Sequence, residues 1–87
     1  MVESNKNLLK SLRRIEGQIR GLEKMVEDNR YCIDIITQTS AVKQALSAVE
    51  DKLLEGHLAS CVVSQIKKGK EREAQQEILR VYRLKRK

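Results

Sequence analysis

The stretch YCIDIITQTSAVKQALSAVEDKLLEGHLASCVVSQI, residues 31–66, decides the expected fold of this chain. It contains no proline and one glycine, Gly56, so nothing in it strongly interrupts a helix. Its apolar residues follow a heptad-like pattern at Ile35, Val42, Leu46, Val49 and Leu53. We therefore expect one helix of about 36 residues, roughly 54 Å long. The segment KKGK at residues 67–70 ends it, because glycine and cations suit a helix C-terminus.

A further helix is expected on each side of this stretch. Residues 5–28 carry apolar side chains at alternating spacings of four and three, typical of a helix seam: Leu8, Leu12, Ile15, Ile19, Leu22 and Val26. Asp28, Asn29 and Arg30 then predict a turn. A shorter helix is expected over residues 71–84, its apolar side formed by Ala74, Ile78, Val81 and Tyr82. We expect residues 83–87 to form a frayed basic tail.

Composition agrees with an all-α fold of three helices per protomer. Aromatic residues make up 2% of the 87 residues and proline is absent, which disfavours sheet and permits long helices. The length predicts a single domain over residues 1–87. No run approaches the roughly 18 apolar residues of a membrane span, and MVESNKNLLK has no signal-peptide core, so we expect a cytoplasmic protein with no membrane partner.

The length of the central helix also predicts a homo-oligomer. Neither neighbouring helix is long enough to cover it in a monomer. Closed two-fold assemblies are the commonest homo-oligomers, so an antiparallel helical bundle of two chains is the expected solution.

Both cysteines and the sole histidine lie on the central helix. His57 and Cys61 are four residues apart, and at about 100° per residue Cys32 points in nearly the same direction, although about 37 Å away along the axis. An antiparallel partner paired near Ala45 and Leu46 would bring Cys32 of one chain beside His57 and Cys61 of the other, at both ends.

The donor set of this intersubunit site indicates its metal. Two thiolates and one imidazole suit trigonal Cu(I), whereas structural zinc normally takes four ligands. Calcium and magnesium need an oxygen-rich cluster, which is absent. Buried packing cysteines, or an intersubunit thiol pair that responds to oxidation, remain alternatives for the same pattern.

Positive charge is concentrated on the first helix. The chain has 18 Lys+Arg against 12 Asp+Glu, a net charge of +6. Several cations fall within roughly 40° of one line, opposite the apolar seam: Lys6, Lys10, Arg13, Arg20 and Lys24. Such a surface can neutralise DNA phosphates, although an ordinary solvated helix face is the plainer alternative. An enzyme is not expected, because the chain has no glycine-rich phosphate loop and no Ser/Asp relay for its histidine.

Several motifs together resemble the CsoR/RcnR family of bacterial metal-sensing transcriptional repressors. They are LRRIEGQIRG at residues 12–21, YCID at residues 31–34, Gln38, SAV at residues 40–42, GHL at residues 56–58 and Cys61. The Cys32, His57, Cys61 set is similar to that of the copper-sensing branch. Ser11 departs from the family, many members of which carry a basic residue at that position.

The resemblance implies a specific assembly and function. It implies an antiparallel four-helix bundle homodimer, paired again into a tetramer, with Cu(I) held by Cys32 of one protomer and by His57 and Cys61 of the other. Tyr31 and Glu77 match positions that support these ligands. Metal-free protein would bind operator DNA, repress copper-resistance genes, and be released by Cu(I). For the DNA contacts we expect the first-helix residues Lys10, Arg13, Arg14 and Arg20.

Other members of the family and one other class of protein remain alternatives. Nickel or cobalt sensors carry further histidines, and formaldehyde sensors tend to carry an N-terminal proline where this chain has Val2. Persulfide sensors use two cysteines without the histidine, so His57 favours copper, while the pair of cysteines keeps a thiol-sensing repressor open. A copper store or chaperone without DNA function is the alternative outside the family.

Overall fold

The computed structural model describes residues 2–86, with side chains from residue 5, and all regular structure within that range is helical. Five segments follow one another: α1 (Val2–Glu27), α2 (Cys32–Gly56), the π-helix η1 (His57–Val62), α3 (Val63–Lys67) and α4 (Glu71–Arg86). The chain divides into two compact units, one up to Lys52 and one from Leu53 onward. The all-α prediction is confirmed. Within residues 2–86 no helix is both long enough and apolar enough to cross a membrane.

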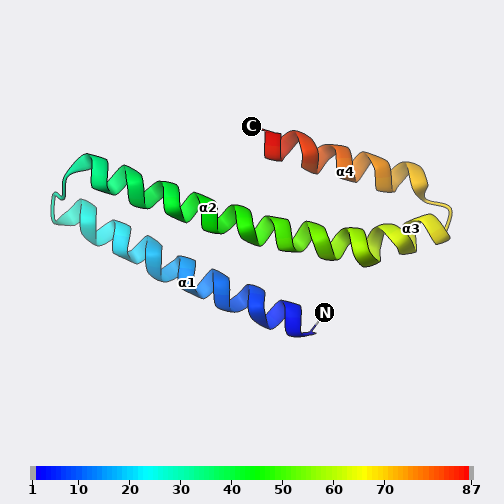
Figure 1. The fold of residues 1–87 in the computed structure, drawn as a ribbon, viewed down its shortest axis with the longest axis horizontal. Helices are drawn as coiled ribbons and strands as arrows, with labels where there is room; N and C mark the ends of the chain where they lie inside the picture. The colour runs from blue at the N-terminus through cyan, green and yellow to red at the C-terminus, as the bar shows by residue number, and fades with distance from the viewer. Residues whose placement is uncertain (1, 87) are drawn as a thin grey trace. The chain divides into compact units, whose positions relative to one another are not determined.

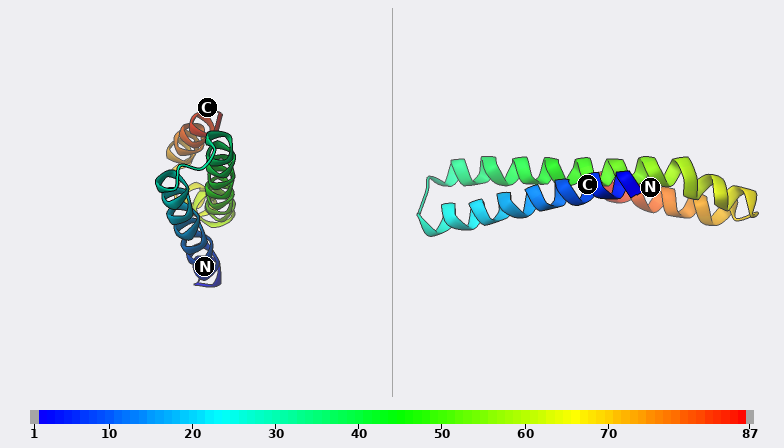
Figure 2. Two further views of the ribbon diagram at one scale, coloured as in Figure 1. Left: turned by 90° about the vertical axis from the view of Figure 1, so that its left-hand side faces the viewer. Right: turned by 90° about the horizontal axis from the view of Figure 1, so that it is seen from below.

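In the first unit, α1 and the part of α2 up to Lys52 form an antiparallel hairpin (Figures 1 and 2). The turn between them ends α1 as the sequence predicted. Asn29 adopts φ 55°, its N–H donates to the carbonyl of Val26 at 3.1 Å, and the N–H of Arg30 donates to that of Met25 at 3.0 Å. This is a Schellman motif, in which asparagine tolerates the left-handed conformation that closes the helix.

The expected seam of α1 divides into two strips. Ile15 is buried against Val42 and Val49, with Leu8 and Leu22 packed beside it, so one position in each heptad faces α2. The other position stays exposed, since Leu12, Ile19 and Val26 are 37%, 42% and 59% accessible. The chain therefore uses half of its first seam for its own core.

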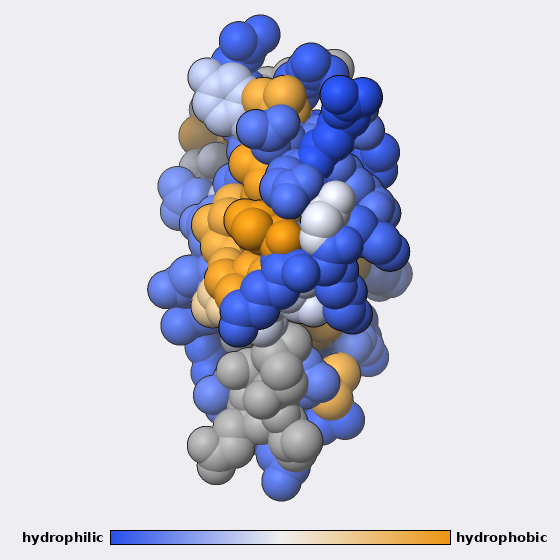
Figure 3. All heavy atoms as spheres, turned by 90° about the vertical axis from the view of Figure 1, so that its right-hand side faces the viewer, coloured by the Kyte–Doolittle hydropathy of each residue, from blue (hydrophilic) through white to orange (hydrophobic). Residues whose placement is uncertain are grey.

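The second unit begins with the end of α2 and continues through η1 and α3 to a turn and α4. Gly69 has φ 77° and donates to the carbonyl of Ile66 at 3.0 Å, while Lys70 donates to that of Gln65 at 2.8 Å, so α3 ends in a Schellman motif as predicted. Ala74 of α4 is buried, at 3% exposure. Figure 3 shows apolar side chains gathered between polar ones at the end where α3 turns into α4.

The long central helix is confirmed with one local difference, and the expected tail is wrong. The predicted helix over residues 31–66 is helical from Cys32 to Lys67, but its six residues 57–62 form the π-helix η1. Gly56 and Val63 on either side of η1, and Val62 at its end, keep right-handed helical dihedral angles. The frayed tail is wrong for Arg83 to Arg86, which belong to α4; Lys87 lies outside the described residues. Cations in a last turn favour the helix, and the Arg86 guanidinium lies 5.8 Å from the ring centre of Tyr82.

Candidate metal centre and basic surface

Cys32 is the first residue of α2 and its side chain is exposed. The preceding Tyr31 is 68% exposed and caps the helix through its backbone, since its carbonyl accepts the N–H groups of Asp34 at 3.0 Å and Ile35 at 3.3 Å. The thiol therefore stands at a fixed helix start in the first unit, with its side chain open to a partner.

The other two expected ligands lie in the second unit, both within η1. His57 opens the π-helix and is half-buried, while Cys61 lies in its second half and is exposed. His57 and Cys61 are four residues apart. This separation is slightly more than one turn of an α-helix, which has about 3.6 residues per turn, and slightly less than one turn of the wider π-helix. Both side chains thus stay on neighbouring parts of one helix face, although the constant 100° step assumed from the sequence ends at Gly56.

The π-helix is the feature of this site that sequence reasoning missed. A single π turn inside an α-helix is uncommon and is frequent at functional sites. Here it contains His57 and Cys61 and no other side chain that binds metals strongly. Ser60 lies within it, and its hydroxyl donates to the Gly56 carbonyl oxygen at 2.9 Å.

The three expected ligands are divided between the two units, Cys32 in the first and His57 and Cys61 in the second. Among the described residues 2–86, no three side chains of His, Cys, Asp or Glu lie close enough together to hold a metal ion. Neither cysteine forms a disulfide within the chain. Two thiols and an imidazole nevertheless form a donor set that fits a soft cation such as Cu(I).

Glu77 of α4, expected near the metal, has a defined partner that the sequence did not indicate. The Nε2 atom of Gln65 in α3 donates to its Oε1 atom at 2.6 Å. Gln65 lies one helical turn after Cys61, so Glu77 contacts the helix that carries a ligand. Nothing in the sequence marks this pair, because the two residues are twelve positions apart on different helices.

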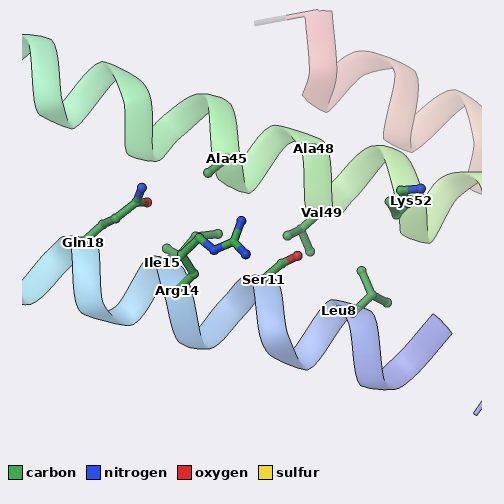
Figure 4. Close-up of a pocket in the computed structure, with 9 residues that line it drawn as sticks. All are labelled: Leu8, Ser11, Arg14, Ile15, Gln18, Ala45, Ala48, Val49 and Lys52. Carbon is green, nitrogen blue, oxygen red and sulfur yellow. The ribbon is translucent and has the colours of Figure 1, made fainter. Parts of the chain in front are cut away.

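The expected DNA-binding residues all lie on α1 with exposed side chains: Lys10, Arg13, Arg14 and Arg20. The structure separates Arg14 from the others. Arg14 lines a groove between α1 and α2 within the first unit, and Lys52 of α2 lines the same groove nearer to Leu8 (Figure 4). The floor of this groove is apolar and contains Ile15, Ala45 and Val49.

The groove also contains polar side chains that sequence reasoning did not single out for binding. Ser11 and Gln18 line it on the α1 side, and the Oε1 atom of Gln18 is buried without a hydrogen-bond partner among the described residues. Lys52 adds a positive charge from α2, which the cationic stripe predicted on α1 does not include. The basic surface therefore has two parts, the stripe on α1 and this groove.

A protein-family model described as "Metal-sensitive transcriptional repressor" matches residues 4–84. Among curated proteins, the copper-sensing transcriptional repressor RicR of Mycobacterium tuberculosis is 49% identical over 63 residues, 72% of this chain and 66% of RicR. The copper-sensing transcriptional repressor CsoR of Bacillus subtilis is 49% identical over 72 residues, 83% of this chain and 71% of that protein. The chain thus spans about two thirds of the length of these relatives.

A solved structure has the same fold. The crystal structure of the copper-sensing repressor CsoR with Cu(I) from Geobacillus thermodenitrificans matches with a TM-score of 0.91 and 46% identity, covering 100% of this chain and 91% of that one. The family and these relatives are repressors rather than enzymes, as the sequence predicted. On the match over residues 4–84 and the 49% identity to two of its members, this chain belongs to the family of metal-sensitive transcriptional repressors.

Proposed function

We propose that this chain is a Cu(I)-responsive transcriptional repressor, in which residues 1–87 act as one DNA-binding and metal-sensing domain. The metal-free form binds operator DNA in the cytoplasm and represses copper-resistance genes, and Cu(I) releases it. The observation that carries the proposal is the Cys32, His57, Cys61 donor set in a chain of this family. Relatives named as copper-sensing repressors, and a related repressor solved with Cu(I), support the choice of metal.

The proposed site is shared by two chains. Cys32 of one chain joins His57 and Cys61 of a second chain around Cu(I), and two-fold symmetry gives two such sites per dimer. Tyr31 and Glu77 are proposed to orient these ligands, since groups around a metal site fix the direction of the side chains that bind it. Bound Cu(I) would supply a positive ion that fixes the relative positions of two chains.

Exposed apolar side chains support an oligomer. Leu12, Ile19 and Val26 on α1 and Leu46 on α2 are 37–59% exposed at heptad spacing, while the alternate positions fill the core of the first unit. Apolar strips of this kind are typical of helix faces that pack against another helix. We propose an antiparallel four-helix bundle dimer, paired again into a tetramer.

The proposed DNA surface is made of Lys10, Arg13, Arg14 and Arg20. Their exposure on one helix supports contacts to phosphates, which supply most of the affinity of a basic protein for DNA. Copper binding and DNA binding are then coupled, so Cu(I) weakens DNA binding and DNA weakens Cu(I) binding by the same factor.

The test is an anaerobic Cu(I) titration of the full chain, with and without the DNA that flanks its own gene. We expect one Cu(I) per chain and loss of DNA binding as the metal is added. Cys32→Ala and His57→Ala should keep DNA binding and lose the response, whereas Ser64→Ala, a change beside the site, should behave as wild type. Specific DNA binding that Cu(I) leaves unchanged would contradict the proposal. Tight Cu(I) binding without any specific DNA would indicate a copper store or chaperone instead.

A further inference from the structure

A hydrogen bond between side chains joins α4 to the helix that carries Cys61. Gln65 donates from Nε2 to Oε1 of Glu77 at 2.6 Å, in a partly buried position across the turn at Gly69. This donor–acceptor distance is slightly shorter than the usual range for N–H···O hydrogen bonds, and carboxylate acceptors favour short bonds. Both residues belong to the second unit, so the contact is internal to it.

The other end of the same amide is not satisfied. The Oε1 atom of Gln65 is buried and has no hydrogen-bond partner among the described residues. A buried acceptor without a partner lowers the stability of the arrangement that contains it. The amide is therefore held by a side-chain hydrogen bond at its nitrogen only.

Gln65 is also close to a proposed ligand along the chain. It follows Cys61 by four residues, one helical turn, in a helix that continues from η1 into α3 without a break in its dihedral angles. A change in the helix backbone at Cys61 would therefore move Gln65, which lies one turn further along the same continuous helix.

The face of α4 turned away from this contact is basic. Ala74 is 3% exposed and Glu77 and Ile78 are half-buried, which identifies the packed face. Arg72, Arg80 and Arg83 are exposed, and their spacing of eight and three residues places them together on the opposite side. The orientation of α4 therefore decides where three positive charges are presented.

From these contacts we infer that Gln65 is a positioning residue of the metal response. Through its hydrogen bond to Glu77 it links the helix after Cys61 to α4, and it passes a change at Cys61 on to α4 when metal binds. The inference rests on the proposed function, because Cys61 serves as a ligand there. The proposed coupling between Cys61 and α4 depends on the side-chain N–H group of Gln65, which donates to Glu77.

The experiment compares two substitutions of similar length in the full chain. Gln65→Met removes the donor, whereas Gln65→Lys keeps an N–H donor toward Glu77. Gln76→Met, at an exposed position on α4, is the matched control. For each protein, DNA affinity is measured by fluorescence anisotropy with and without Cu(I) under anaerobic conditions, and Cu(I) affinity without DNA is measured by competition with a chelator.

We expect a selective loss of coupling. In Gln65→Met the ratio of DNA affinities without and with Cu(I) should fall about tenfold, while Gln65→Lys and Gln76→Met stay within about threefold of wild type. Metal-free DNA affinity and Cu(I) affinity should be unchanged in all three. Hydrogen exchange of the α4 amides should respond to Cu(I) in wild type and in Gln65→Lys, but not in Gln65→Met.

Other outcomes overturn the inference in distinguishable ways. A wild-type ratio in Gln65→Met, or an equal loss in Gln65→Met and Gln65→Lys, would exclude a role for the donor group. A parallel loss of metal-free DNA binding or of Cu(I) affinity in Gln65→Met would show a merely structural role. If wild type itself shows no effect of Cu(I) on DNA binding, the proposed function fails, and this inference fails with it.

Discussion

The hydroxyl of Ser60 donates a hydrogen bond to the carbonyl oxygen of Gly56 at 2.9 Å. Gly56 is the last residue of α2, and Ser60 lies in η1 between His57 and Cys61. In an α-helix this carbonyl would accept the backbone N–H of Ser60. Bonds from Ser or Thr side chains to the carbonyl four residues back compete with the helix ladder and often bend helices. Thr37 and Thr39 make the same kind of bond inside α2, so the bond alone does not produce a π turn. At Ser60 it ties the start of the π turn to the end of α2, between His57 and Cys61.

Replacing Ser60 should weaken metal binding without touching a ligand. In Ser60→Ala the hydroxyl and its bond to Gly56 are lost, and Cu(I) affinity should fall about tenfold, as for other groups that orient metal ligands. The measurement is competition with a Cu(I) chelator. Ser64→Ala, one turn later in α3, is the control. Equal affinities for Ser60→Ala and wild type would show that the hydroxyl does not fix the site.

The core of the first unit predicts a large effect of one substitution on stability. Ile15 is 4% exposed and packs against Val42 and Val49. Ile15→Ala should lower the free energy of unfolding by about 2 to 5 kcal/mol, because it removes buried methyl groups and leaves a cavity. Urea denaturation at a fixed protein concentration measures this, since an oligomer's stability depends on concentration.

The same substitution at an exposed isoleucine gives the control for that measurement. Ile36 is 62% exposed, and Ile36→Ala should change the free energy of unfolding by about 0.5 kcal/mol or less. A loss as large as that of Ile15→Ala would mean that Ile36 is buried against another chain.

Periodicity and end signals in the sequence were enough to predict the helices and the turns between them. Asn29 and Gly69 adopt the positive φ angles that close α1 and α3, as residues of these types do at helix ends. The seam of α1 was predicted as one strip, but a single neighbouring helix covers only the heptad positions of Leu8, Ile15 and Leu22. Periodicity finds apolar positions and does not tell which neighbour buries them.

The π turn and the Gln65 to Glu77 contact were beyond sequence reasoning for different reasons. The π turn changes the hydrogen-bond pattern over six residues without any residue type that demands it, and the expectation of a uniform helix followed from the absence of proline. The Gln65 to Glu77 contact depends on how the turn at Gly69 directs α4, which is a tertiary property. The grouping of Cys32, His57 and Cys61 stays a prediction.

Mixed dimers test that grouping directly. Cys32→Ala and Cys61→Ala each remove one ligand from both sites of a homodimer, so neither variant should bind Cu(I) tightly. In a dimer of one chain of each kind, one site lacks both cysteines and the other keeps Cys32, His57 and Cys61. Mixing the two variants with subunit exchange should therefore restore tight binding of one Cu(I) per mixed dimer.

Two controls make the result specific. A mixture of Cys61→Ala with His57→Ala should restore nothing, because both changes lie on the same side of every shared site. Recovery with that pair as well, or no recovery with Cys32→Ala and Cys61→Ala after exchange is verified by mass spectrometry, would mean that the site is not shared as proposed.

The salt dependence of DNA binding tests the basic surface. Each phosphate contact contributes about 0.9 to the slope of log affinity against log salt, so the double variant Arg13→Ala, Arg14→Ala should reduce the slope by about two and weaken binding at every salt concentration. The double variant Lys67→Ala, Lys68→Ala removes the same charge from the end of α3 and should leave the slope unchanged. Equal slopes in wild type and the arginine variant would remove these arginines from the interface.

Single variants separate the two parts of that surface. Arg14 and Lys52 line the same groove, whereas Arg13 belongs to the stripe on α1. If a phosphate enters the groove, Arg14→Ala and Lys52→Ala should each lower the slope by about 0.9, and the double variant should lose little more, because both cations contact one phosphate. If DNA contacts the stripe alone, Lys52→Ala will match wild type and Arg13→Ala will carry the loss. Reduced slopes for both Arg14→Ala and Lys52→Ala would show that the DNA interface extends to α2, which the stripe on α1 did not predict.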